Sequence, residues 1–161
     1  MEIEMTIKGL MVDPITNMPI IVLRDVDGQR VLPIWVGVFE ANAIALQIEK
    51  VQTPRPMTHD LLKNVIDDLS ASVERIVVCD LRDNTFYARI HLRAGETQVA
   101  VDARPSDAIA LALRSEAPIF VDETVISGAK DIDSSRDQLN VARLREWLDG
   151  LSEDELGKYK M

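Results

Sequence analysis

The feature that most constrains the fold is a run of three strand-like segments joined by two-residue connections. Residues 74–82, 85–93 and 96–103 are rich in β-branched and aromatic residues. Between them stand Asp83-Asn84 and Ala94-Gly95, dipeptides that suit tight hairpin turns. Two-residue connections can join only antiparallel strands, because a parallel pair needs a long crossover. The region therefore predicts a three-stranded antiparallel meander.

The rest of the chain alternates between strand and helix patterns. Apolar residues at helical spacing predict amphipathic helices, whereas alternation and short apolar runs bounded by turn residues predict strands. We expect further strands over residues 2–7, 18–24, 30–36 and 118–125, and helices over residues 39–50, 58–69 and 105–115. The fold class expected is α+β: a mixed, largely antiparallel β-sheet packed with about three helices over residues 1–126.

The C-terminal part reads differently. Residues 127–137 (SGAKDIDSSRD) have the composition of a linker, and residues 138–161 predict a helical tail. The tail helix has more apolar surface than a peripheral helix needs, and 47% of the chain is hydrophobic, which favours a homo-oligomer. The alternative is that this helix packs on its own domain. Its apolar residues are Val141, Leu144, Trp147 and Leu148.

Charge and composition restrict the function classes. The net charge of −9 argues against a protein that coats nucleic acid with its whole surface, since such proteins are usually basic. A local basic site and an enzyme that recruits divalent metal through carboxylates both remain open. No apolar run approaches the length of a membrane span, and the acidic, alternating N-terminus is not that of a signal or transit peptide. The single cysteine, Cys79, fits a reducing compartment, so we expect a cytoplasmic protein.

Two of the expected helices start in the same way, with Arg-Pro followed by a hydroxyl residue and an aspartate. The segments are RPMTHD (55–60) and RPSD (104–107). Proline holds the preceding arginine in an extended conformation, so its side chain leaves the helix axis. Thr58 and Ser106 are expected as helix caps rather than reactive groups.

Three segments together resemble the bifunctional nuclease domain family of bacteria and plants. They are LPIWVGVFEANAIALQIE, RPMTHDLL and VDARPSDAIALALRSEAPIFV, in this order, and the resemblance covers residues 1–126. Members of that family have been assigned both RNase and DNase activity, so the resemblance implies a nuclease with nucleic acid as substrate. It also points to self-association.

Four carboxylates in these segments could hold Mg²⁺ or Mn²⁺ for phosphodiester hydrolysis: Glu40, Asp60, Asp102 and Asp107. Each also has a structural explanation. Glu40, Asp60 and Asp107 stand at helix starts, where the helix dipole favours acids. Asp102 ends a strand and could pair with Arg104 or Arg55. Glu40, Asp60 and Asp102 are nevertheless catalytic candidates.

His59 is the base candidate, because a neutral histidine can accept a proton from water, although it could also be an exposed residue without a role. Arg55 and Arg104 are the candidate phosphate clamps. A second candidate surface is the strand face of Tyr87, Arg89, His91 and Arg93, where cations and an aromatic ring could bind a nucleic-acid strand. A solvated sheet face is the alternative.

We therefore predict a metal-dependent nuclease of low sequence specificity, active on RNA, DNA or both. The competing hypothesis is a non-catalytic oligomeric binding protein whose arginine–carboxylate set is a structural network or a small-ligand pocket.

Overall fold

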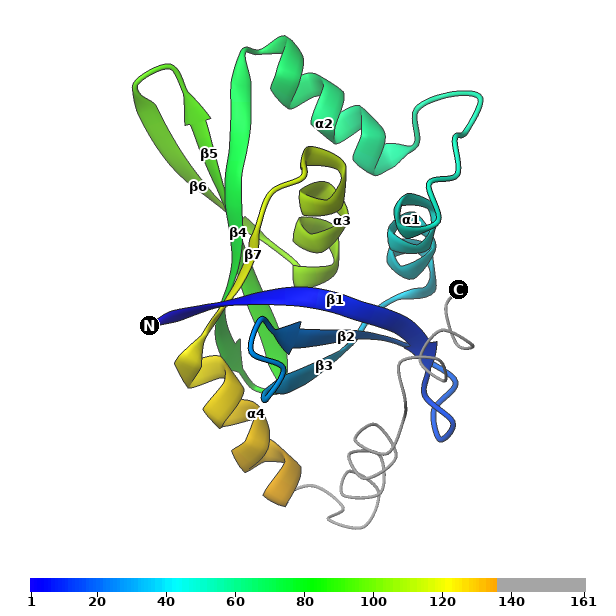
Figure 1. Ribbon diagram of the computed structural model, residues 1–161, viewed down its shortest axis with the longest axis vertical. Coiled ribbons are helices and arrows are strands. Elements are labelled where there is room, and N and C mark those ends of the chain that lie inside the picture. Colours follow the sequence, from blue (N-terminus) through cyan, green and yellow to red (C-terminus); the bar gives the residue numbers. More distant parts are fainter. Residues whose placement is uncertain (136–161) are drawn as a thin grey trace.

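Seven strands form one mixed sheet in this computed structural model, which describes residues 1–135 of the chain (Figure 1). The strand order is β3-β2-β1-β7-β4-β5-β6, and every neighbouring pair is antiparallel except β4 and β7, which are parallel. The predicted α+β class and largely antiparallel sheet are confirmed. The strands are β1 (Glu2–Val12), β2 (Pro19–Asp25), β3 (Val31–Trp35), β4 (Ala71–Arg82), β5 (Thr85–Ala94), β6 (Thr97–Ala103) and β7 (Ile119–Asp122).

The predicted meander is the β4–β5–β6 part of this sheet. Asp83 and Asn84 both have positive φ angles, 50° and 61°, as the hairpin turns that match strand twist require. Gly95, at φ 62°, makes the second turn. The meander therefore forms from local sequence, as its short connections predict.

Helices α1 (Val38–Ile48), α2 (Thr58–Asp68) and α3 (Pro105–Ser115) lie on one side of the sheet, and α4 (Glu123–Ser135) follows β7 (Figure 1). Helix α3 is central, because it contacts α1, α2, β4 and β5. Its residues 108–112 are buried, and three of those five are alanines, which allows close approach on every side. None of the helices within residues 1–135 is long and apolar enough to cross a bilayer.

The segment after β7 corrects one expectation. The predicted linker, residues 127–137, is helical through Ser135, and the strand predicted to reach residue 125 ends at Asp122. The reason is an apolar stripe of Val125, Ile126 and Ala129, all buried in the main core, with the helix packed against β4 and β7. The predicted tail, residues 138–161, lies outside the described residues.

Both Arg-Pro helix starts differ from the predicted caps. Thr58 is the first residue of α2, and the N-cap is Met57, whose backbone N–H donates to Asp60 Oδ2 at 3.0 Å. In α3 the N-cap is Arg104, followed by Pro105, and Ser106 makes no side-chain cap bond. In the first motif it is thus the aspartate, and not the hydroxyl residue, that makes the side-chain bond at the helix start.

A buried carboxylate organises the β1–β2 connection. Asp13 is 2% exposed, and its oxygens accept hydrogen bonds from the Trp35 indole, the Thr16 hydroxyl and the Ile15 N–H, each at 2.8 Å. Burial raises the pKa of Asp13, but these hydrogen bonds outweigh it and hold the pKa below its usual value. Asp13 therefore ties the β1–β2 loop to β3.

We expect Asp13→Ala to lower the free energy of unfolding by about 2 kcal/mol, because it leaves the half-buried Trp35 indole and the Ile15 N–H without their acceptor. Thr16→Ala, which removes one donor to Asp13 and a long, exposed acceptor of the Met18 N–H, is the matched control and should cost about 1 kcal/mol or less. Urea unfolding followed by circular dichroism measures both. Equal losses in the two variants would contradict the role given to Asp13.

Candidate active site

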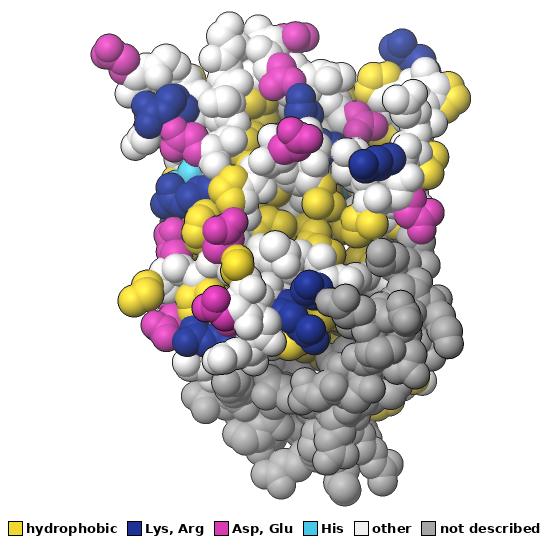
Figure 2. All heavy atoms as spheres, in the orientation of Figure 1, with side chains coloured by type: hydrophobic (Ala, Val, Ile, Leu, Met, Phe, Trp, Pro, Cys, Tyr) yellow, Lys and Arg dark blue, Asp and Glu magenta, His cyan; other side chains and the backbone are white. Residues whose placement is uncertain are grey.

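A groove of about 840 Å³ opens between α1, α2 and the junction of β6 with α3. Its walls are mostly apolar. On the face of the molecule drawn in Figure 2, apolar side chains gather in the middle with charged groups around them. Phe39, at 88% exposed, is the most exposed aromatic side chain on its rim. All three predicted motifs contribute, through Phe39, Glu40, Asn42, Ala43, Met57, Thr58, His59, Leu61, Leu62, Val65, Asp102, Ala103, Arg104 and Asp107, with Ile90 and Val101 from the sheet.

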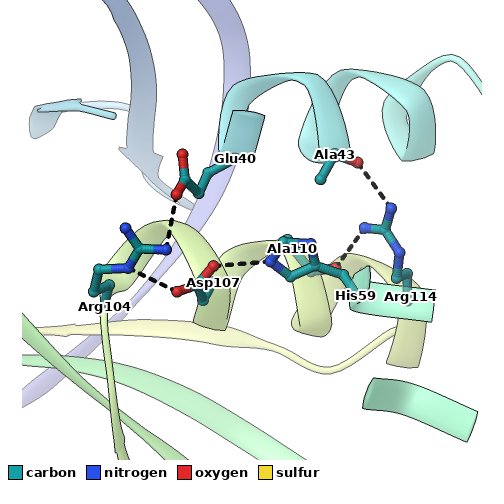
Figure 3. A network of polar contacts seen from close by, with 7 residues as sticks. All are labelled: Glu40, Ala43, His59, Arg104, Asp107, Ala110 and Arg114. Atoms are coloured by element: carbon teal, nitrogen blue, oxygen red, sulfur yellow. Dashed lines mark hydrogen bonds and ion pairs between the residues drawn. The ribbon is translucent and has the colours of Figure 1, made fainter. Parts of the chain in front are cut away.

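A continuous polar network lies along this groove (Figure 3). His59 Nε2 is 2.8 Å from Asp107 Oδ1, and Arg104 Nε donates to Asp107 Oδ2 at 2.8 Å. Arg104 also reaches Glu40 Oε1 with its terminal nitrogen at 2.8 Å. Four predicted site residues from three helices, His59, Asp107, Arg104 and Glu40, are thus brought together.

Local backbone structure positions the two ends of this network. Arg104 has φ −70° and ψ 144°, the extended conformation expected before proline, so its side chain turns back toward Asp107 and Glu40. Glu40 folds over Gly37, the N-cap of α1, where an added Cβ would lie 2.3 Å from Glu40 Oε2. Glycine at position 37 therefore leaves room for the carboxylate that Arg104 binds.

Charge interactions fix the ionisation of this network. Partial burial raises the pKa of Asp107, but the hydrogen bonds with His59 and Arg104 outweigh it and lower the pKa overall. The hydrogen bond and charge of Asp107, with Glu40, raise the pKa of Arg104. Asp107 is therefore ionised, and Arg104 charged, across the neutral pH range.

Arg114, which the sequence did not single out, connects the second motif to the helices. Its side chain is 4% exposed, and it donates to Asp60 Oδ1 at 2.6 Å. It also donates to the Ala43 carbonyl at 3.0 Å and to the Ala110 carbonyl at 2.9 Å (Figure 3). Burial raises the pKa of Asp60, but hydrogen bonds from Met57 and Arg114 lower it overall. Asp60 is thus held by the helix framework rather than free in the groove.

Two predicted residues stay outside the network. Asp102 borders the groove with its backbone. In the β5–β6 register it stands next to Arg89, so its side chain lies on the other face of the sheet from the side chains of Ile90 and Val101. Arg55 is exposed, and within residues 1–135 its side chain joins no ion pair. The predicted pairing of Asp102 with either arginine is not found among these residues.

The predicted basic face of β5 is present, on the sheet side away from the groove. Arg89 and Arg93 are exposed, and Tyr87 and His91 are half-buried, while Ala88 and Ile90 point into the core. Arg93 is paired with Glu74, and the Arg82 guanidinium lies 4.1 Å from the centre of the Tyr87 ring. Burial lowers the pKa of His91, with the charges of Arg75 and Arg89 acting in the same direction.

The described residues do not make a ready metal site. Within residues 1–135 no group of three or more His, Cys, Asp or Glu side chains is placed to hold an ion. Glu40 and Asp107 share Arg104, and Asp60 is bound to Arg114. The Mg²⁺ or Mn²⁺ requirement expected from the sequence therefore stays a prediction.

Comparison with known proteins identifies similar sequences. Residues 21–133 match the family model described as the bifunctional nuclease domain. A Mycobacterium tuberculosis protein named only as uncharacterized is 38% identical over 94% of this chain and 96% of its own length. Bifunctional nuclease 2 of Arabidopsis thaliana is 30% identical over 72% of this chain, and bifunctional nuclease 1 of Oryza sativa subsp. indica 28% over 65%. The matched regions cover 37% and 33% of those plant proteins.

We expect Arg114→Met to lower the free energy of unfolding by roughly 2–4 kcal/mol, because it leaves Asp60 and the Ala43 carbonyl without their donor. Since Asp60 is 31% exposed, we place the loss below that of a fully buried pair. Arg93→Met, which breaks the more exposed pair with Glu74, is the matched control and should cost less than about 1 kcal/mol. Similar losses in urea unfolding would contradict the role of Arg114.

Stability should also fall in acid. The lowered pKa values of Asp60 and Asp107 mean that their contribution is full above the unfolded pKa, about 4, and is lost as the pH falls through the folded values. In the variant Asp60→Asn, the free energy of unfolding should depend less on pH between pH 5 and about pH 2 than in the wild type. The pKa of His91 is also lowered, so its neutral form favours the folded state, and this contribution is lost as the pH falls below the unfolded value of about 6.5. The variant His91→Gln removes this contribution and separates it from that of the acids.

Proposed function

Because this chain belongs to the bifunctional nuclease domain family, we propose that it hydrolyses phosphodiester bonds in RNA, DNA or both, with low sequence specificity. The family match covers most of the chain. The activity named for the plant relatives comes to this chain only as part of the proposal, since the matches cover about a third of those proteins.

The observation that carries the proposal is the His59–Asp107 pair beside Arg104 in the groove. A carboxylate that accepts a hydrogen bond from one imidazole nitrogen fixes the ring and leaves the other nitrogen able to accept a proton. When Nε2 carries the proton bound to Asp107, Nδ1 is the basic atom. His59 would then take a proton from the attacking hydroxyl or water, and Asp107 would stabilise the imidazolium that forms.

Arg104 supplies the phosphate contact. Its side chain is 66% exposed even though two of its nitrogens bind Asp107 and Glu40, so part of the guanidinium faces solvent. Held in place by those carboxylates, it could donate to a phosphate oxygen without first being ordered. The two acids also leave the group of Arg104, Glu40 and Asp107 with a formal charge of −1, so phosphate binding needs further positive charge. A divalent cation would supply it.

The groove walls favour a single strand bound without sequence readout. The Phe39 ring is exposed on the rim, and any of the bases can stack on an aromatic ring. Leu61 and Leu62 continue the apolar wall. Most of the groove surface is apolar and offers no hydrogen bonds to base edges, which fits low specificity.

Three finer expectations remain proposals. We propose dependence on Mg²⁺ or Mn²⁺, self-association and a cytoplasmic location. The first rests on the carboxylates of the motifs. The last rests on a single cysteine in 161 residues.

His59→Gln should lower the rate of cleavage of labelled single-stranded RNA and DNA by about 10²-fold or more, the usual effect of losing a general base. Arg104→Lys keeps the charge but loses the fork that binds Asp107 and Glu40 together, so cleavage should also fall. Arg30→Lys is the matched control, because its pair with Glu123 is remote from the groove, and its rate should equal that of the wild type. Asp102→Asn decides whether an acid on the other sheet face takes part.

Each variant is assayed with added Mg²⁺, with Mn²⁺ and with EDTA, and its melting temperature is recorded. Normal cleavage by His59→Gln, or losses that follow lost stability in every variant, would reject the proposal. The second result would support a structural network in a non-catalytic binding protein. Cleavage unchanged by EDTA would reject metal dependence alone.

A further inference from the structure

We propose that two copies of this chain pair through their β6 strands, antiparallel to each other, so that one sheet continues across both copies. This inference gives self-association a specific surface and does not rest on nuclease activity. The partner is a second copy of the same chain.

Strand β6 is an unprotected sheet edge. It ends the strand order of the sheet, and six of its seven residues, from Thr97 to Asp102, are exposed. Its free edge presents backbone N–H and C=O groups that can pair with another strand. The opposite edge, β3, carries Pro33 in its centre, which limits such pairing. β6 contains no proline and a single charge, Asp102.

The helix-facing side of this edge is apolar and uncovered. Val99 is 45% exposed and Val101 41% exposed, next to Leu92 and Ile90 of β5. Across the groove, Val65 of α2 is 46% exposed. An apolar surface continuous with a free strand edge is the combination that marks an interface in a soluble protein.

An antiparallel pair centred on Ala100 matches both faces of this edge. On the helix side, Val99 lies opposite the partner's Val101, which extends the Leu92–Val99 row into an apolar row across the interface. On the other side, Gln98 lies opposite the partner's Asp102, so that acid has its own Arg89 on one side and a neutral amide on the other, with Arg93 of the facing chain one strand beyond.

The register centred on Asp102 is worse. A pair centred on Asp102 would set two carboxylates directly opposite each other, which is destabilising. It would also leave Val99 without an apolar partner. The register centred on Ala100 uses the whole strand, from Thr97 to Ala103. The charge pattern and the apolar pattern therefore both favour the register centred on Ala100 over the one centred on Asp102.

This arrangement bears on the candidate site. The two-fold axis of an antiparallel edge pair is perpendicular to the sheet, so both helix layers lie on the same side. The groove is bordered by residues 101–104 at the end of β6. The two grooves would open side by side, on either side of the shared strand pair.

Cysteine cross-linking tests the register in the full chain, with Cys79→Ser as background. Ala100→Cys places two thiols at the two-fold axis, about 4.5–5.5 Å apart between Cα atoms, within disulfide range. Gln98→Cys, exposed on the same face, is the matched control, because its copies are roughly 13 Å apart along the strands. We expect a disulfide dimer on non-reducing gels for Ala100→Cys and none for Gln98→Cys. Gln98→Cys combined with Asp102→Cys should cross-link again.

Sedimentation at micromolar concentration tests the contact itself. The wild type should be a dimer or a larger assembly, and Val99→Lys should shift it toward smaller species with an unchanged circular dichroism spectrum, since Val99 is already exposed in one copy. Val26→Lys, at a residue 68% exposed in the β2–β3 turn, is the control and should sediment like the wild type. A monomeric wild type, equal cross-linking of Ala100→Cys and Gln98→Cys, or Val99→Lys that assembles normally would overturn the proposal.

Discussion

The buried guanidinium of Arg114 is the contact on which the candidate site depends. It joins α3 to Asp60 of α2 and to the Ala43 carbonyl of α1. Helix α2 needs this contact, because Ile66 is its only buried residue. Arg114 and Asp107 are seven residues apart, two turns of α3, so they lie on one face of it. The neighbouring residues Asp60 and His59 each bind one of them. Placing Asp60 on Arg114 therefore also places His59 on Asp107.

The site is a compromise between structure and chemistry. Its acids are paired with arginines, as partly buried carboxylates require. The same pairing fixes the direction of Arg104 and of the His59 ring, which is the order that catalysis needs before substrate arrives. Substrate does not have to displace this network, since Arg104 remains largely exposed. The same contacts would therefore be present in a nuclease active site and in a purely structural network, and cleavage activity is what distinguishes the two.

Much of this arrangement was predictable from short-range patterns. The two-residue turns determined the meander, and the Arg-Pro starts placed Arg104 and His59 near helix ends. Alternation along β6 separated Asp102 from Val101, but a period of two does not tell which face the helices cover. Arg114 was missed because an arginine in the last turn of a helix also suits the helix dipole. The helix over residues 123–135 was missed because Ser127, Gly128 and the acids that follow outweighed a short apolar stripe.

The position of β7 has a consequence for how the chain folds during synthesis. This four-residue strand, near the end of the described residues, lies between β1 and β4 and joins the two antiparallel parts of the sheet. Until residue 119 leaves the ribosome, the first hairpins and the meander can each form but cannot be joined. The contacts between β1 and β7 span more than 110 residues of sequence, a separation that slows folding. Two unsatisfied strand edges, on β1 and β4, are therefore exposed on the nascent chain, and these edges are where a chaperone would be needed most.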